Sequence, residues 1–236
     1  MWTSGVDYQQ TIGWYRFTGG GGFGGGGGGG GVGPLSVNDN QYVHSTTGTN
    51  SQLTVTTSVA NQVICVLFFE NSHIRGPTTA DISDNRGLTW QQLGSSVLIN
   101  SGATYIGAFF AQAPTAQTYT ITLDWSNVGW DAFASVNAFC VVNGDTVTFV
   151  DPNASNPTGN TTGLASMTTS NAKDIIFGVA LTVSPGTVAG GWTTLQNVSG
   201  DFFVSMYRIE SATNTFTLNT GGGTQLGSFI GALKGN

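Results

Sequence analysis

The sequence predicts an all-β protein, a two-sheet antiparallel β-sandwich that carries an extended N-terminal arm. From Leu53 onward, runs of β-branched and aromatic residues alternate with short turns rich in Gly, Asn, Pro and Ser. No segment with a helical period extends beyond two turns. A glycine run near the start separates a short aromatic segment from everything that follows. We therefore expect an anchor at 1–17, a spacer at 18–34 and a β-sandwich body at 35–236.

The aromatic segment, MWTSGVDYQQTIGWYRF, is predicted to be a binding element. It holds more large rings than a free tail leaves in water, namely Trp2, Tyr8, Trp14, Tyr15 and Phe17. One interpretation is an extra strand that packs on the chain's own body. The other is an anchor for a partner protein, because aromatic side chains with a few polar neighbours are favoured in interface cores.

The spacer, TGGGGFGGGGGGGGVGP, cannot belong to a packed core, because glycine has no side chain to bury and loses the most freedom on ordering. As a coil it spans about 20 Å, and as an extended strand about 45 Å. Association into a homo-oligomer such as a trimer would let several glycine strands share hydrogen bonds. The run also matches a nucleotide-binding glycine pattern trivially, but no strand-then-helix context follows it, so we reject that site.

The body is predicted to contain a series of short strands separated by turns such as Asp84-Asn85-Arg86-Gly87. The predicted strands are 53–57, 63–69, 78–82, 89–93, 105–111, 119–124, 132–142, 146–150, 175–183, 202–210, 215–218 and 227–233.

The body also repeats itself. TTSVANQVICV from Thr56 parallels TTSNAKDIIFGV from Thr168, and GLTWQQL with Trp90 parallels GGWTTL with Trp192. The spacing between matched segments shrinks along the chain, as loop shortening after a duplication would produce. We expect the two pseudo-repeats to interleave into one sandwich, with Trp90 and Trp192 at related buried positions.

The second half carries, in order, TTSNAKDIIFGVAL, a Gly-Trp-Thr turn, an aromatic strand, a T-x-T-F-T-L strand and the closing GSFIGALK. This order resembles the jelly-roll-type β-sandwich domains of bacteriophage virion proteins, and also some bacterial surface domains. The resemblance covers roughly residues 45–236. It implies a jelly-roll fold and a structural role in a virion.

Charge excludes several classes of function. Charged residues make up 8% of the chain, and the net charge is −6. The six basic residues are scattered with no two adjacent, whereas nucleic-acid binding needs clustered positive charge. No apolar run reaches the ~20 residues of a membrane-spanning helix, and the start lacks the features of a secretory signal. We therefore expect synthesis in a host cytoplasm, no membrane and no nucleic-acid partner.

Catalytic chemistry is not expected. The chain has two histidines, His44 and His73, both predicted to lie at the surface, and no recognisable nucleophile motif. The carboxylate pairs Asp124 with Asp131 and Asp145 with Asp151 suit turns as well as a glycosidase.

The loop 145–156 offers oxygen ligands without the spacing of a calcium loop, so we predict no metal and no cofactor. Cys65 and Cys140 lie in apolar runs, as small buried hydrophobes or as a disulfide between core strands.

The leading expectation is a structural, non-enzymatic virion protein, a capsid decoration or head-fibre protein attached to other virion proteins through its N-terminal arm. The alternative is a tail-associated adhesin that recognises cell-surface carbohydrate through exposed aromatic rings at Trp125 and Trp130.

Overall fold

Strands β1 to β16 of the computed structural model form antiparallel sheets, so the all-β prediction is confirmed. The structure describes residues 34–46, 49–72, 75–99, 104–128, 130–142, 150–153, 155–184, 186–198, 200 and 202–235, without the side chains of 72 and 130–133. The predicted anchor and the spacer before Pro34 lie outside this part. Among the described residues, no helix is long and apolar enough to cross a membrane.

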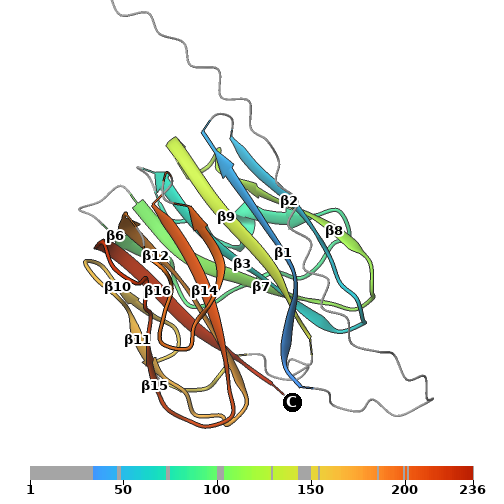
Figure 1. The fold of residues 1–236 in the computed structure, drawn as a ribbon. Helices are drawn as coiled ribbons and strands as arrows, with labels where there is room; N and C mark the ends of the chain where they lie inside the picture. The colour runs from blue at the N-terminus through green and yellow to red at the C-terminus, as the bar shows by residue number, and fades with distance from the viewer. Residues whose placement is uncertain are drawn as a thin grey trace, which may run out of the picture. The chain divides into compact units, whose positions relative to one another are not determined.

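The first half of the body, residues 34–142, forms a large sheet and a small one (Figure 1). The large sheet has the order β1 (Ser36–Ser45), β9 (Trp130–Val142), β3 (Gln62–Ser72), β7 (Thr104–Ala113) and β5 (Gln91–Gln92), with β6 (Val97–Ile99) also paired to β7. The small sheet has the order β2 (Asn50–Thr56), β8 (Thr118–Asp124) and β4 (Ile82–Asp84).

The second half, residues 150–235, has the same layout in the orange and red strands of Figure 1. Its large sheet has the order β10 (Thr158–Asn160), β16 (Thr224–Lys234), β12 (Asp174–Val183), β14 (Phe203–Glu210) and β13 (Thr193–Val198). Its small sheet pairs β11 (Ser166–Thr168) with β15 (Thr215–Thr217).

Three hydrophobic clusters hold these sheets together. The first lies between the large and small sheets of the first half, and the third lies between those of the second half. The second cluster lies between the two large sheets, where Cys65 and Phe139 meet Phe177 and Phe229. Both faces of each large sheet are therefore buried, which explains the continuous apolar runs VICVLFF and DIIFGVAL.

The two cysteines point to opposite faces of the first large sheet. Side chains along a strand point to opposite faces in turn. Cys65 of β3 faces the second cluster, whereas Cys140 of β9 faces the first. Both are buried and free, because the sheet itself separates their sulfur atoms. Of the two interpretations, the small buried hydrophobe is confirmed.

The halves do not interleave as predicted. Each described sheet takes all of its strands from one half, because each large sheet is already covered on one face by its own small sheet. Only the two remaining faces are left to pack against each other. The strand order nevertheless corresponds: β1-β9-β3-β7-β5 matches β10-β16-β12-β14-β13, and β2-β8 matches β11-β15. The jelly-roll type stays a prediction.

Trp90 and Trp192 occupy related buried positions, as predicted. Each is 8% exposed, Trp90 in the first cluster and Trp192 in the third. The indole Nε1 of Trp90 donates to Asp84 Oδ2 at 2.9 Å, and that of Trp192 donates to the Thr217 carbonyl at 3.0 Å. Each ring closes the space between a large sheet and its small sheet.

Several predicted strand positions are wrong. Residues 79–81 form a single 3-10 turn, η1 (Thr79–Asp81), because Thr78 and Asp81 make a reciprocal capping box. Strand β1 was missed because its sequence, SVNDNQYVHS, is polar, and β10 because it is three residues long. Of the predicted strand 146–150, the described part is Val150, which forms an isolated bridge to Leu233.

Candidate functional site

The N-terminal arm joins the body at one end of the large sheets. We call this the arm end: β1 begins there at Ser36, and β16 ends there at Lys234. A Cβ built on Gly235 would lie 2.3 Å from Leu35 Cδ1, so the residues just before β1 and just after β16 lie side by side there. Figure 1 shows the start of β1 and the C-terminal end of β16 at the same end of the body. The backbone N–H of Gly235 also donates to the Lys173 carbonyl at 2.5 Å. The opposite end of the same strands is called the far end.

A polar seam crosses the otherwise apolar contact between the halves. Asn137 of β9 is fully buried, and its Oδ1 accepts a hydrogen bond from Ser205 Oγ of β14 at 2.8 Å. Its Nδ2 donates to Asn40 Oδ1 at 2.7 Å and to the Gln41 carbonyl at 2.8 Å. Asn40 Nδ2 in turn donates to the Leu195 carbonyl of β13 at 2.7 Å. These bonds fix the register of one half against the other, because a slip would leave buried polar atoms unpaired.

His44 and Ser135 are the nearest approach to a base and nucleophile pair among the described residues. Ser135 Oγ lies 2.8 Å from His44 Nδ1 and accepts a hydrogen bond from Tyr42 Oη at 3.1 Å. Ser135 is fully buried within the paired strand β9, so its hydroxyl faces the seam rather than solvent. The pair therefore extends the seam along β1, and His44 is half-buried instead of lying at the surface as predicted.

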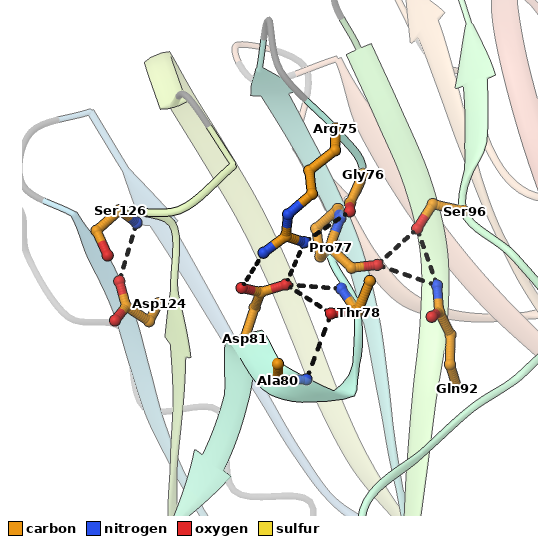
Figure 2. Close-up of polar contacts among 10 residues, drawn as sticks. All are labelled: Arg75, Gly76, Pro77, Thr78, Ala80, Asp81, Gln92, Ser96, Asp124 and Ser126. Carbon is orange, nitrogen blue, oxygen red and sulfur yellow. Dashed lines mark hydrogen bonds and ion pairs between the residues drawn. The ribbon is translucent and has the colours of Figure 1, made fainter.

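An ion pair fixes the segment before η1, as Figure 2 shows. Arg75 binds Asp81 through both guanidinium Nη atoms, at 2.6 and 2.7 Å. Burial by itself raises the pKa of Asp81, but the bonds from Arg75 and Thr78 outweigh it and hold that pKa below its ordinary value. A two-point Arg–carboxylate contact is geometrically specific. Here it closes a loop of its own chain.

Hydrogen bonds between uncharged groups hold the neighbouring segment around Pro77 in place. The Pro77 carbonyl accepts from Gln92 Nε2 at 3.1 Å and from Ser96 Oγ at 3.0 Å (Figure 2). Asp124, at the end of β8, accepts from the Ser126 backbone N–H at 2.9 Å, as an ordinary turn residue does. Its predicted partner Asp131 has no described side chain. Asp124 is thus placed in a turn, and the glycosidase pair with Asp131 stays untested.

Asp151 organises the loops at the arm end of the second half. It is 1% exposed, and its carboxylate accepts from the backbone N–H groups of Asn153, Ser170 and Asn171 at 2.8, 2.9 and 2.9 Å. Ser170 Oγ adds a further bond at 3.0 Å. Burial alone raises the pKa of Asp151, but these bonds outweigh it and lower that pKa. The predicted partner Asp145 lies outside the described residues, as does His73.

The described residues contain no group of three or more His, Cys, Asp or Glu side chains able to hold a metal ion. The loop after Val150 instead uses its oxygens internally: Asn156 Oδ1 accepts from the Ala232 backbone N–H at 2.9 Å. Burial also raises the pKa of both cysteine thiols, Cys65 and Cys140, which favours the uncharged and unreactive form.

The expected exposure of Trp125 is wrong. Its side chain is 0% exposed, and Nε1 donates to the buried Ser51 Oγ at 2.8 Å. The ring fills the first cluster beside Phe68, at 6.5 Å between ring centroids, so it has no face for a sugar. Trp130 begins β9 at the far end, and its side chain lies outside the described part.

The outward faces of the small sheets carry rows of hydroxyl and amide groups, as the low charge content suggests. In the first half, Thr56 faces Thr118 at 3.1 Å between hydroxyl oxygens, and Gln52 Nε2 donates to Thr122 Oγ1 at 3.2 Å. In the second half, Thr168 faces Thr215 at 2.8 Å. These rows make the exposed surface of both outer sheets polar without ion pairs.

Sequence reasoning missed the seam and one buried acid, Asp174. The available signals were polar residues inside apolar strands, at Asn137 in SVNAFCVV and at the start of DIIFGVAL.

Comparison with protein-family models, curated proteins and solved structures gives no match to this chain.

Proposed function

We propose that this chain is a structural, non-enzymatic protein of a bacteriophage particle, a capsid decoration or head-fibre protein attached through its N-terminal arm. The observation that carries the proposal is the place where the arm joins the body. The arm enters at one end of the strands, where Leu35 contacts Gly235. Strands of ten residues span about 30 Å, so the loops of the far end lie about that far from the point of attachment.

The polar groups of the body support a structural role. The carboxylates of Asp81 and Asp151 are buried and receive several hydrogen bonds from their own loops. His44 and Ser135 belong to the seam between the halves. The proposed partners are other virion proteins, with the shell or tail contacted by the aromatic segment and further copies of this chain contacted through the glycine spacer. The protein is made in the host cytoplasm.

Copy number in purified particles tests this proposal. A decoration or head-fibre protein is present in scores to hundreds of copies, which gel densitometry against the major shell protein measures. A particle with only a few copies contradicts this role.

A truncated chain starting at Val32 tests the role of the arm. It should fold with unchanged stability, because the three clusters are formed by described residues of 34–235. It should also fail to bind particles that lack the protein. If it decorates those particles as well as the full chain does, the arm is not the anchor.

A tail-associated adhesin that binds cell-surface carbohydrate is the second candidate. The far end favours it, because Val183 is 41% exposed and Phe202 36% exposed there. Phe202 also has a φ of +56°, a strained backbone for a residue with a side chain. Trp130 starts β9 at the same end. This candidate predicts a few copies per particle and binding to host-cell glycans that Trp130→Ala and Phe202→Ala both weaken.

A further inference from the structure

A fully buried acid, Asp174, opens strand β12 at the arm end. Its exposed fraction is 0%, although it carries an ionisable group. Oδ1 accepts a hydrogen bond from Asn171 Nδ2 at 3.1 Å. Oδ2 is also buried, and no donor among the described residues reaches it. A buried carboxylate oxygen without a donor is costly, so the charged form of Asp174 is poorly supported here.

The charged groups around Asp174 come from three elements. Lys234 of β16 and Glu210 of β14 stand directly opposite it in the two neighbouring strands. Lys234 attracts a negative charge at Asp174, whereas Glu210 already pairs with Arg208. Asp151 faces it from the loop after Val150, and its charge disfavours a second anion. Asp174 Oδ2 therefore has no donor among the described residues, while a second carboxylate acts on the same side chain.

A proton resolves this conflict. Asn171 bridges the two acids, because its backbone N–H donates to Asp151 at 2.9 Å and its Nδ2 donates to Asp174 at 3.1 Å. A hydrogen bond between the two carboxyl groups requires that one of them carries hydrogen. Asp151 is held as an anion by N–H donors on both of its oxygens. We propose that Asp174 is protonated in the folded protein at mildly acidic pH and donates from Oδ2 to Asp151, so that this carboxyl pair fastens the loop 151–153 to the start of β12.

The first half supplies an internal comparison. Gln62 opens β3 as Asp174 opens β12, and TTSVANQ corresponds to TTSNAKD. Gln62 is 1% exposed; its Nε2 donates to Asn38 Oδ1 at 2.6 Å, and its Oε1 accepts from Val59 N–H at 3.3 Å. The position thus uses a neutral side chain that both donates and accepts. A protonated carboxyl meets the same requirement, and a carboxylate does not.

The pKa of Asp174 agrees with this geometry. Burial raises it to about 7, with Asn171 opposing and Asp151 adding to the rise. Because the folded pKa lies above the ordinary value of 3.8, the folded state holds a proton that the unfolded chain releases. The stabilising contribution is complete below about pH 4 and is lost as the pH rises toward 7. Above 7 both states are ionised, and the difference stays constant.

A bound cation is the competing explanation for two adjacent carboxylates. The lone pairs of Asp151 are largely occupied by N–H and O–H donors, and Lys234 already supplies positive charge to Asp174. Calcium binding needs six to eight oxygen ligands. The geometry therefore favours a proton.

The test compares unfolding of the full chain and its Asp174→Asn variant in denaturant from pH 4 to pH 9. Asparagine keeps the acceptor for Asn171 and a donor for Asp151 without titrating. Relative to this variant, the unfolding equilibrium constant of the natural chain should rise about tenfold per pH unit between about 4 and 7, and then level off. Equal pH dependence of the two chains overturns the proposal.

Two controls keep the test decisive. Asp124→Asn removes a carboxylate from a turn at the far end and should leave the pH-dependent difference intact. If Asp174→Asn does not fold, carbon NMR of the natural chain replaces it: the Asp174 carboxyl should titrate near pH 7, and titration near 3.8 overturns the proposal. Stabilisation of the natural chain by millimolar Ca²⁺ at pH 5, absent after chelation, also overturns it in favour of a cation, because the proposal has Asp174 protonated at that pH.

Discussion

The two halves of the body share one strand order but close their cores with different side chains at the arm end. In the first half, Oε1 of Gln62 accepts hydrogen bonds from the backbone N–H groups of Ser58 and Val59. In the second half, Oδ2 of Asp151 accepts hydrogen bonds from the corresponding backbone N–H groups of Ser170 and Asn171. Asn171 also donates to Asp174 through its side chain. One closure is neutral and the other ionisable. The comparison teaches that strand order alone does not set how a protein's stability depends on pH.

The largest expected effect tests whether the cores of the halves are equivalent. Trp90→Ala and Trp192→Ala should each lower the free energy of unfolding by about 3–5 kcal/mol, because each removes a buried aromatic ring and leaves a cavity. Denaturant unfolding measures both. Similar losses support equivalent cores, whereas a cost below about 1 kcal/mol for either variant contradicts them.

A smaller loss is expected from Asp151→Asn, which acts on the second half. The amide nitrogen would face N–H donors that now bind a carboxylate, so the free energy of unfolding should fall by about 2–3 kcal/mol at pH 7. The pKa of Asp151 is lowered in the folded state, so its own contribution is present above pH 3.8 and disappears as the pH falls further. The difference between the two chains should therefore shrink in acid, as acid titration of unfolding would show.

Gln62→Glu should give the first half the pH dependence that we propose for the second. A glutamate at this buried position can replace the donor to Asn38 only when it is protonated. The variant should match the natural chain near pH 4 and be about 1–2 kcal/mol less stable at pH 8. A loss that is the same at both pH values would mean that shape, rather than charge, decides the position.

The smallest expected effect concerns the Arg75–Asp81 ion pair, which belongs to the first half. Arg75→Lys loses the two-point contact with Asp81 but keeps the charge, and the Arg75 side chain is 37% exposed. We expect the free energy of unfolding to fall by about 0.5–1 kcal/mol, and the difference between the two chains to shrink as salt screens the ion pair. Hydrogen exchange should quicken in 75–81 and remain unchanged in the second half. Faster exchange across both halves would show that this loop supports the whole body.

The sequence predicts strands best where both faces are apolar. The runs around Cys65 and Phe177 were recognised because both sides of each strand are buried. β1 was missed because it is a polar edge strand whose pairing with β9 decides its conformation. The prediction that Trp125 is exposed was wrong. Its polar neighbours Asp124 and Ser126 favoured a surface position, and the sequence does not show that the ring packs between two sheets. The carboxyl pair could not be predicted, since its two acids lie 23 positions apart in the sequence and meet only through the fold.

The shared cluster between the large sheets makes the body resemble a dimer joined into one chain. Neither half could be excised as a soluble module, because removing its partner would expose a whole apolar face, including Phe139 and Val141 on one side or Phe177 and Phe229 on the other. A protein made of one such half would have to pair with a second copy through that face. The contact between halves is thus an oligomer interface with a fixed partner, whose assembly does not depend on protein concentration.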